Sequence, residues 1–298
     1  MTAGERPLQA AHVDALVALT LHRLLSTAQL HALRGAGASR RWTQHVLHEL
    51  ERRGLAAHVR AGGALKLWRV TPAGAERVRG DGRLPRTPRL LTAEEASGPL
   101  QAHTLAVNDV GVAFVRAALA RGEQFGVTSW KHEVAHPLMG GRGRRRQQLI
   151  ADAVLSYLLE RDDRIALQYA FLELDRATLP SDRLATKLAR YAQLHRLRDE
   201  GGDPPWRKWY PRFPALLVVL AGGPLDVLER RRQTALALCG SDPELVRAPE
   251  VEISIGLLAE LEREGPFAPI FRQPRDPERP VDWLERAGAT SGPDGGGG

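Results

Sequence analysis

The sequence predicts a mixed α/β fold of the α+β kind, divided into two successive domains. Through residues 1–80, apolar residues recur at helical spacing and then give way to two short strand-like runs. Further along, five strand-like runs occur, most of them apolar and bounded by charged or turn-forming residues, and segments of helical period lie among them. Helices and strands interspersed in this way predict a mixed sheet with helices packed on it.

The first domain, residues 1–80, is expected to contain three helices, a two-stranded hairpin and a further helix. Ser26 and Ser39 are suited to cap the second and third helices, because their hydroxyls can accept hydrogen bonds from the first turn. On the third helix, four residues share one face and should pack inward: Trp42, Val46, Leu47 and Leu50. The expected elements cover residues 13–25, 27–33, 39–53, 55–60 and 65–70, with another helix starting at 71–74.

This order of elements resembles the winged helix-turn-helix of DNA-binding proteins. The resemblance implies a recognition helix whose outward side chains reach base edges, where Arg and Gln make bidentate contacts: Arg40, Arg41, Gln44, His45 and His48. On the wing, three cations would contact phosphates: Arg60, Lys66 and Arg69. The alternative is a winged helix that binds protein or dimerises and carries a basic face incidentally.

Charge separates the first domain from the rest of the chain. Residues 1–80 hold 12 Lys and Arg against 5 Asp and Glu, whereas the remaining residues hold 30 of each sign. The whole net charge of +7 therefore lies in the first domain, which favours a polyanion such as nucleic acid as partner. The alternative is a solvated surface that uses Arg in place of Lys.

The cysteine content and the hydropathy pattern indicate in which cellular compartment the protein resides. The single Cys239 excludes a disulfide framework and favours a reducing compartment. The first 25 residues show no signal-peptide pattern, and the apolar run at residues 215–221 is too short to span a bilayer. These features predict a cytoplasmic protein with no membrane partner.

A segment rich in Gly, Pro and Arg, residues 81–99, is expected to link the first domain to the second, residues 100–262. Residues 263–298, which are rich in Pro, Arg and Gly, are expected to form a mostly disordered tail. Within the second domain, helices are expected at 103–121, 181–197 and 225–238. The expected strands cover 125–134, 148–158, 165–175, 215–220 and 251–255.

Three carboxylates fall inside or at the end of two of these strands: Asp152, Glu173 and Asp175. Glu173 and Asp175 are two residues apart, so a strand directs both side chains to the same face. Burying carboxylates among apolar residues is costly unless cations or hydrogen bonds compensate, and hard divalent cations bind carboxylate oxygens. The pattern therefore predicts the core of a metal-dependent phosphodiesterase.

The α-β-β-β-α-β series with these acids resembles the PD-(D/E)xK restriction-endonuclease-like fold. More closely, the chain resembles the replication-relaxation family of plasmids and other mobile elements, over about residues 13–222. The ordered pieces that carry the resemblance are HTLAVNDVGVAF at 103–114, WKHE at 130–133, IADAVL at 150–155, FLELDRAT at 171–178 and KLARYAQL at 187–194.

The resemblance implies that Asp152, Glu173 and Asp175 form the catalytic and metal-binding set, with Mg or Mn as cofactor. Asp175 stands where the nuclease motif has its lysine, so Lys187 on the following helix is the candidate to orient the attacking water. Ala151 replaces the usual proline, which shapes the backbone and coordinates nothing. Glu133, at the end of the first strand, is a further candidate acid.

Plainer interpretations remain open for each of these residues. Asp152 alone could be a solvated strand end, Glu173 and Asp175 could pair with Arg176 or Arg183, and Lys187 could be a surface lysine. A loop of arginines between two strands would grip phosphates or be a disordered hairpin tip: Arg144, Arg145 and Arg146.

The sequence as a whole predicts a DNA-binding protein of a plasmid or integrated mobile element, acting in replication or mobilisation. The first hypothesis is a metal-dependent, relaxase-like endonuclease that nicks DNA. It would bind duplex DNA through the winged helix, with single-stranded DNA at the second domain. The alternative is a catalytically inactive DNA-binding regulator of plasmid replication or copy number. The oligomeric state stays open, a homodimer included.

Overall fold

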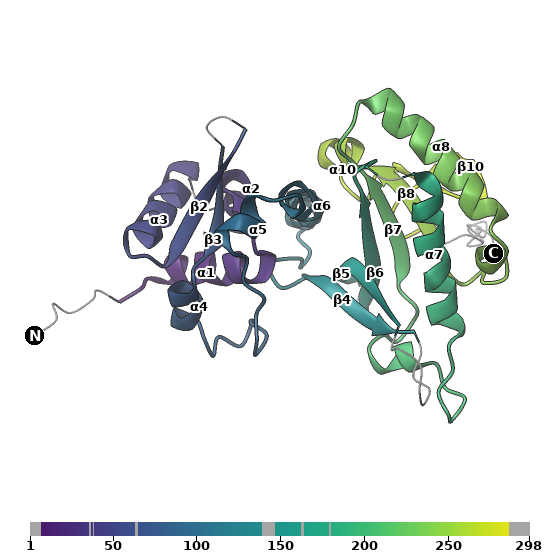
Figure 1. Ribbon diagram of the computed structural model, residues 1–298, viewed down its shortest axis with the longest axis horizontal. Coiled ribbons are helices and arrows are strands. Elements are labelled where there is room, and N and C mark those ends of the chain that lie inside the picture. The colour runs from purple at the N-terminus through teal and green to yellow at the C-terminus, as the bar shows by residue number, and fades with distance from the viewer. Residues whose placement is uncertain are drawn as a thin grey trace, which may run out of the picture. The chain divides into compact units, whose positions relative to one another are not determined.

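The structure is a computed structural model that describes residues 7–35, 37, 39–62, 65–138, 147–161, 164–178 and 180–285. Its contacts divide the chain into two compact units (Figure 1). The first unit comprises Met1–Ala135 and Ile150–Leu174, and the second comprises His136–Leu149 and Asp175–Gly298. The mixed α/β class predicted from the sequence is confirmed, with a three-stranded antiparallel sheet and a seven-stranded mixed sheet among the described residues.

The first unit begins with the elements that the sequence predicted, in the predicted order. Ser26 caps the second helix with a full capping box, and Ser39 and Thr71 cap later helices through their hydroxyls. The hairpin strands pair with a short additional strand in the order β1-β3-β2. These elements are α1 (Ala10–His22), β1 (Leu25–Ser26), α2 (Thr27–Leu33), α3 (Arg40–Arg52), β2 (Ala56–Ala61), β3 (Leu65–Val70) and α4 (Pro72–Arg77).

Trp42 corrects the predicted inward face of α3. Its side chain is 39% exposed and stacks on His45, whereas Thr43 is fully buried. Thr43 lies three and four residues before Val46 and Leu47, so it sits at the centre of the buried stripe and Trp42 at its margin. The bulky indole would not fit where the small Thr43 side chain packs beside α2. The prediction that Val46, Leu47 and Leu50 are buried is confirmed.

The predicted linker is a packed part of the first unit. It contains α5 (Ala93–Ser97), which Thr92 caps, and it buries Leu91 and Ala96 against Leu24 and Leu67. The next helix, α6 (Leu100–Arg121), contacts α2 through Gln29 of α2, whose side-chain amide donates to Leu105 O at 3.0 Å and to Asp109 Oδ1 at 2.7 Å. The unit boundary therefore does not coincide with residues 81–99.

The larger sheet has the strand order β10-β9-β8-β7-β6-β5-β4. β5 and β6 are antiparallel, and β7 and β8 are parallel. The strand expected at residues 125–134 starts only at Trp130, as β4, because Gly126 and Ser129 form a turn before it. The strands are β4 (Trp130–Pro137), β5 (Gln148–Arg161), β6 (Arg164–Asp175), β7 (Ala215–Leu220), β8 (Ile253–Leu257), β9 (Phe271–Gln273) and β10 (Asp276–Val281).

Helices of the second unit pack on its strands. α7 and α8 contact each other and run side by side, and α8 also contacts β8 (Figure 1). These helices and the shorter ones that follow are α7 (Ser181–Arg196), a 3-10 turn at Pro205–Lys208, α8 (Leu225–Ser241), α9 (Pro243–Val246) and α10 (Leu258–Glu264).

The start of the predicted disordered tail is wrong. Residues 263–285 include the end of α10 together with β9 and β10, and they bury Phe271, Val281 and Trp283. Isolated apolar residues in a Pro- and Arg-rich segment give no periodic pattern from which strands could be predicted. Each can still be buried by packing against a sheet that other segments form. Residues 286–298 lie outside the described part of the chain.

Candidate functional site

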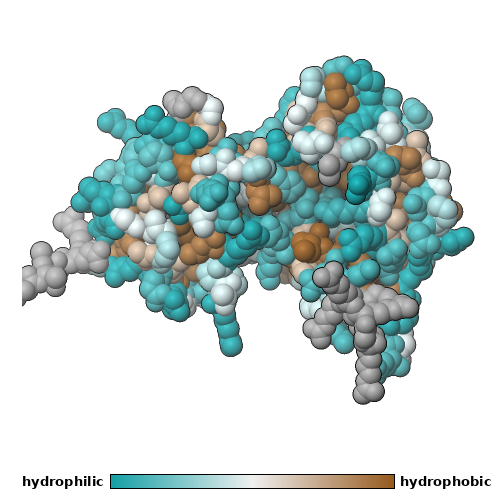
Figure 2. Space-filling view, in the orientation of Figure 1, coloured by the Kyte–Doolittle hydropathy of each residue, from teal (hydrophilic) through white to brown (hydrophobic). Residues whose placement is uncertain are grey.

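The predicted recognition residues all lie on the exposed face of α3, opposite the buried Thr43 and Val46. Because the helical repeat separates the two faces, one side can pack on α1 and α2 while the other meets solvent. Hydrophilic residues predominate where α3 reaches the surface (Figure 2). The exposed residues are Arg40, Arg41, Gln44, His45 and His48.

The hairpin cations have three different environments. Arg60 is exposed on β2. Lys66 on β3 places its Nζ 3.3 Å from His48 Nε2 and 5.4 Å from the centre of the Trp68 ring, so it adjoins the exposed face of α3. Arg69 instead donates from Nη1 to the Leu91 carbonyl at 3.3 Å, which ties its guanidinium to the segment before α5. Arg60 and Lys66 therefore remain better placed for phosphates than Arg69.

The predicted phosphate-gripping arginines, Arg144, Arg145 and Arg146, lie outside the described residues.

Asp152 and Glu173 lie on neighbouring strands of the first unit. Ala153 pairs with Leu172 in the antiparallel register, which places Asp152 and Glu173 at the next pair of positions. The Leu174 N–H donates to Asp152 Oδ2 at 2.8 Å. Glu173 is only 2% exposed, so its carboxylate is buried in a strand whose neighbours are apolar.

His103 on α6 approaches the same carboxylate. Its Nε2 lies 3.5 Å from Asp152 Oδ2, close enough for an ion pair when the imidazole is protonated. The sequence did not single out His103, although it opens the first of the family-like pieces. Asp152 is therefore oriented from two sides, by a backbone N–H and by an imidazole.

Asp175 has a different environment from the one expected of a metal ligand. Its carboxylate pairs with Arg231 of α8, and both side chains are only 11% exposed. Asp175 Oδ1 also accepts the Ala177 N–H at 3.0 Å. A buried guanidinium partner neutralises the carboxylate, which explains how this acid can be buried. The partner is neither Arg176 nor Arg183, the two that the sequence suggested.

Lys187 lies on α7 of the second unit, half-buried, between the buried Leu184 and Leu188. It therefore borders the packed face of this helix. Among the described residues there is no group of three or more His, Cys, Asp or Glu side chains that could hold a metal ion. The assignment of Asp152, Glu173, Asp175 and Lys187 to one catalytic site stays a prediction.

Comparison with known families decides what kind of protein this is. The model of the replication-relaxation family matches residues 16–202, more than half of the chain. The chain belongs to the replication-relaxation family. Membership indicates a role in the replication or mobilisation of a plasmid or another mobile element. No curated protein and no solved structure matches the chain. Within the described residues, no helix is both long and apolar enough to cross a bilayer.

This replication-relaxation protein has a buried histidine network in its first unit that the sequence did not reveal. The His22 ring stacks on Trp130 with centroids 3.9 Å apart, and its Nε2 hydrogen-bonds to Val127 O at 2.8 Å. His132 Nε2 lies 3.4 Å from His22 Nδ1 and 3.0 Å from Asn108 Oδ1. Burial lowers the pKa of His22 to about 3, against the raising effect of the Val127 hydrogen bond.

The same network holds an unusual turn. Arg23 has φ 67° and ψ −51°, and Leu24 N–H donates to His22 O at 2.7 Å, which defines a γ-turn of the strained, positive-φ form. Asn108 Nδ2 donates to both His22 O and Leu24 O, at 3.2 and 2.8 Å, and so clamps the turn. Asn108 and His132 belong to two of the family-like pieces, and the fold brings these pieces together.

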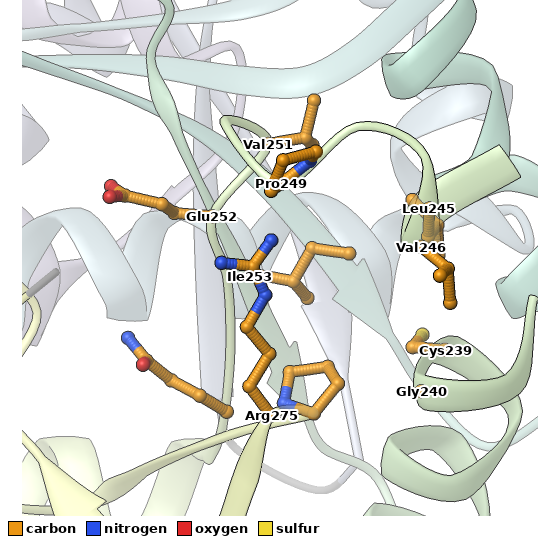
Figure 3. A pocket seen from close by; sticks show the side chains of 11 residues that line it. Cys239, Gly240, Leu245, Val246, Pro249, Val251, Glu252, Ile253 and Arg275 are labelled. Carbon is orange, nitrogen blue, oxygen red and sulfur yellow. The ribbon is translucent and has the colours of Figure 1, made fainter. Parts of the chain in front are cut away.

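A small pocket of about 130 Å³ lies in the second unit. Figure 3 shows Cys239, Leu245 and Val246 on one side of it, and Ile253 and Arg275 on the other. Burial, with a smaller effect of the Asp242 charge, raises the pKa of the Cys239 thiol to about 12. A thiol that stays protonated is a poor nucleophile, so the pocket offers no reactive cysteine.

Proposed function

We propose that this protein binds duplex DNA in a plasmid or mobile-element origin through α3, in the manner of a winged helix-turn-helix. The observation that carries the proposal is the exposed row of Arg40, Arg41, Gln44, His45 and His48 on a helix whose opposite face is buried. Arginine and glutamine side chains make bidentate contacts to base edges, and Lys66 and Arg60 flank the helix for phosphates. The element order through β3 and the net positive charge of residues 1–80 support the proposal.

Substitutions on α3 and the hairpin test this proposal. Arg41→Ala should weaken binding to a specific duplex by about 1–3 kcal/mol, because a bidentate base contact is lost. Lys66→Ala should weaken binding to all duplexes and lower the slope of log K against log salt by about 0.9, because one phosphate contact is lost. Equal losses for specific and random duplexes in Arg41→Ala would contradict base recognition.

We further propose that the protein nicks one DNA strand with a divalent metal held by Asp152 and Glu173. Two carboxylates on adjacent strand positions fit an ion of the Mg²⁺ class, which binds one or two carboxylates and keeps several waters. Asp175 does not fit this set, because Arg231 already occupies its carboxylate. Such an ion, when bound, lowers the pKa of a coordinated water and offsets charge on the phosphoryl oxygens.

The protein's own residues would orient the reactants around this pair. The Leu174 N–H and His103 fix the position of the Asp152 carboxylate, and burial of Glu173 keeps competing water away from its oxygens. Lys187 is proposed to orient the attacking water and to offset phosphate charge, an assignment that rests on its place in the sequence.

A second candidate is a DNA-binding regulator without nuclease activity. It is favoured by the Asp175–Arg231 ion pair, which replaces one expected metal ligand with a structural contact.

Incubation with supercoiled plasmid and Mg²⁺ or Mn²⁺ distinguishes the two candidates. A nicking enzyme should produce relaxed circles, and Glu173→Gln should lower the rate by orders of magnitude while leaving duplex binding unchanged. The matched control is Asp175→Asn, which removes the same charge two residues away and should retain nicking in the fraction that folds. Absence of relaxed circles together with absence of metal binding in a calorimetric titration would leave the regulator.

A further inference from the structure

A large groove with several charged side chains in its lining lies within the first unit, and no residue of α3 lines it. Its volume is about 810 Å³, and it is lined by residues 20, 21 and 23 at the end of α1, by residues 82–85 and 87–89, and by residues 128 and 130–134. This volume lies within the range of about 300–1,000 Å³ typical of ligand sites. Its charged lining residues are Arg23, Arg83, Arg89, Lys131 and Glu133.

One of these cations, Arg83, is already paired with two carboxylates. The Arg83 guanidinium contacts Asp14 at 2.8 Å and Asp81 at 2.8 Å. The hydrogen bond from Arg83 holds the pKa of Asp81 down at about 2, so this carboxylate stays charged. Arg83 therefore stabilises the wall of the groove and has no charge to spare for a ligand.

The other two arginines share a single carboxylate. Arg23 Nη1 lies 2.7 Å from Glu133 Oε1, and Arg89 Nη1 lies 2.5 Å from Glu133 Oε2. The second carboxylate near Arg89, Glu95, is 3.7 Å away and also caps the backbone of α5. Lys131 is exposed on the same wall. Three cations thus face one lining carboxylate, which leaves the groove with excess positive charge for an anion.

The backbone holds this arrangement at a cost. Arg23 lies in its strained γ-turn, and Glu133 has φ 50°, a left-handed conformation that non-glycine residues seldom adopt. Such a conformation is strained and persists where the surroundings enforce it, which is typical of binding sites. Here Asn108 enforces the turn through its bonds to His22 O and Leu24 O. Strain at both ends of one ion pair suggests that the position of the guanidinium groups matters for function.

We infer that this groove binds the sugar–phosphate backbone of a single DNA strand, with Arg23, Arg89 and Lys131 contacting its phosphates. The inference rests on the proposed function only in taking DNA as the ligand. Glu133 holds the two guanidinium groups in place until phosphates share them. The groove has the volume of a small-ligand site, which suits a strand of a few nucleotides better than a duplex.

The lining also favours contact with the backbone over the bases. Trp130, the one Trp, Tyr or Phe among the described lining residues, is only 1% exposed and is covered by the His22 ring. Bases therefore have no aromatic platform on which to stack, unlike in single-strand-binding surfaces that use stacking. Contact through phosphates predicts binding that depends strongly on salt and little on sequence.

Binding of a labelled oligothymidylate of about 12 nucleotides, which is within single-strand site sizes, tests the inference on the full chain. Arg89→Ala and Lys131→Ala should each weaken binding by roughly 5- to 10-fold and lower the salt slope by about 0.7, the value for one phosphate on a single strand. Glu133→Gln should tighten binding by roughly 5-fold, because it removes the competing charge. The control is Arg116→Ala, which removes an exposed arginine of α6 that does not line the groove.

The outcomes separate this inference from duplex recognition by α3. Loss of single-strand binding in the two groove variants, with Arg116→Ala unchanged, supports the groove even if Arg41→Ala has no effect on duplex binding. The inference is overturned if wild type does not bind the oligonucleotide or if the groove variants bind it as wild type does. In either of those cases a duplex defect in Arg41→Ala would still support the proposed function.

Discussion

Gly111 on α6 has no room for a side chain, and Gly111→Ala should destabilise the first unit. A Cβ at this position would lie 2.5, 2.6 and 2.9 Å from three atoms of the Trp130 indole, Cε2, Cζ2 and Cδ2. The indole cannot move away easily, because it is 1% exposed, stacks on His22 and lies parallel to Phe125 at an angle of 2°. The substitution therefore has two opposing effects on stability: alanine favours the helix more than glycine does, and its methyl group overpacks the core.

The magnitudes favour overpacking. Alanine in place of glycine gains about 1 kcal/mol of helix propensity, whereas overpacking of a rigid core costs about 1–3 kcal/mol. Displacing the indole from His22 and Phe125 would cost about a further 0.5–1.5 kcal/mol in ring contacts. The expected net loss is about 0.5–3.5 kcal/mol, which lowers the Tm of a unit of this size by roughly 1–14 °C.

Thermal unfolding followed by near-ultraviolet circular dichroism of the tryptophans would measure this loss. Gly126→Ala is the matched control, because a Cβ there meets no atom within 4 Å and its φ is not left-handed. This control should stay within about 0.5 kcal/mol of wild type. A Tm for Gly111→Ala at or above that of wild type would refute the reasoning, since helix propensity would then outweigh the contact with Trp130.

Two further predictions concern charge in the core. Folding lowers the pKa of His22 from 6.5 to about 3, so between these values only the unfolded chain binds a proton at this site. The contribution of neutral His22 to stability should be complete above pH 6.5. Below pH 6.5 the free energy of unfolding should fall by about 1.4 kcal/mol per pH unit, as urea titrations at several pH values would show. If His22→Gln shows the same dependence of the free energy of unfolding on pH as wild type, the dependence does not come from His22. In the second unit, Arg231→Leu should cost about 3–5 kcal/mol, because it leaves the Asp175 carboxylate buried without its cation. The double variant Arg231→Leu/Asp175→Asn should be more stable than Arg231→Leu alone in chemical denaturation. If it is not, the unpaired Asp175 carboxylate is not the cause of the loss of stability.

Local patterns in the sequence were sufficient for most of the elements. The 3.6-residue period and the capping hydroxyls of Ser26 and Ser39 located α2 and α3, because both signals act within one helix. The division of α3 into a buried and an exposed face followed from the same period. The exception, Trp42, lies at the margin of the stripe, where a side chain's direction depends on the space that neighbouring helices leave.

Only the tertiary structure decided which polar residues meet. Asp175 pairs with Arg231, which is 56 residues away, and not with either nearby arginine. Asn108 clamps a turn 84 and 86 residues earlier in the chain, and Arg23 meets Glu133, which is 110 residues further along. A sequence shows which side chains could ionise or donate hydrogen bonds. Which of them are buried together, and therefore which charges are neutralised and which remain for a ligand, depends on how distant segments pack.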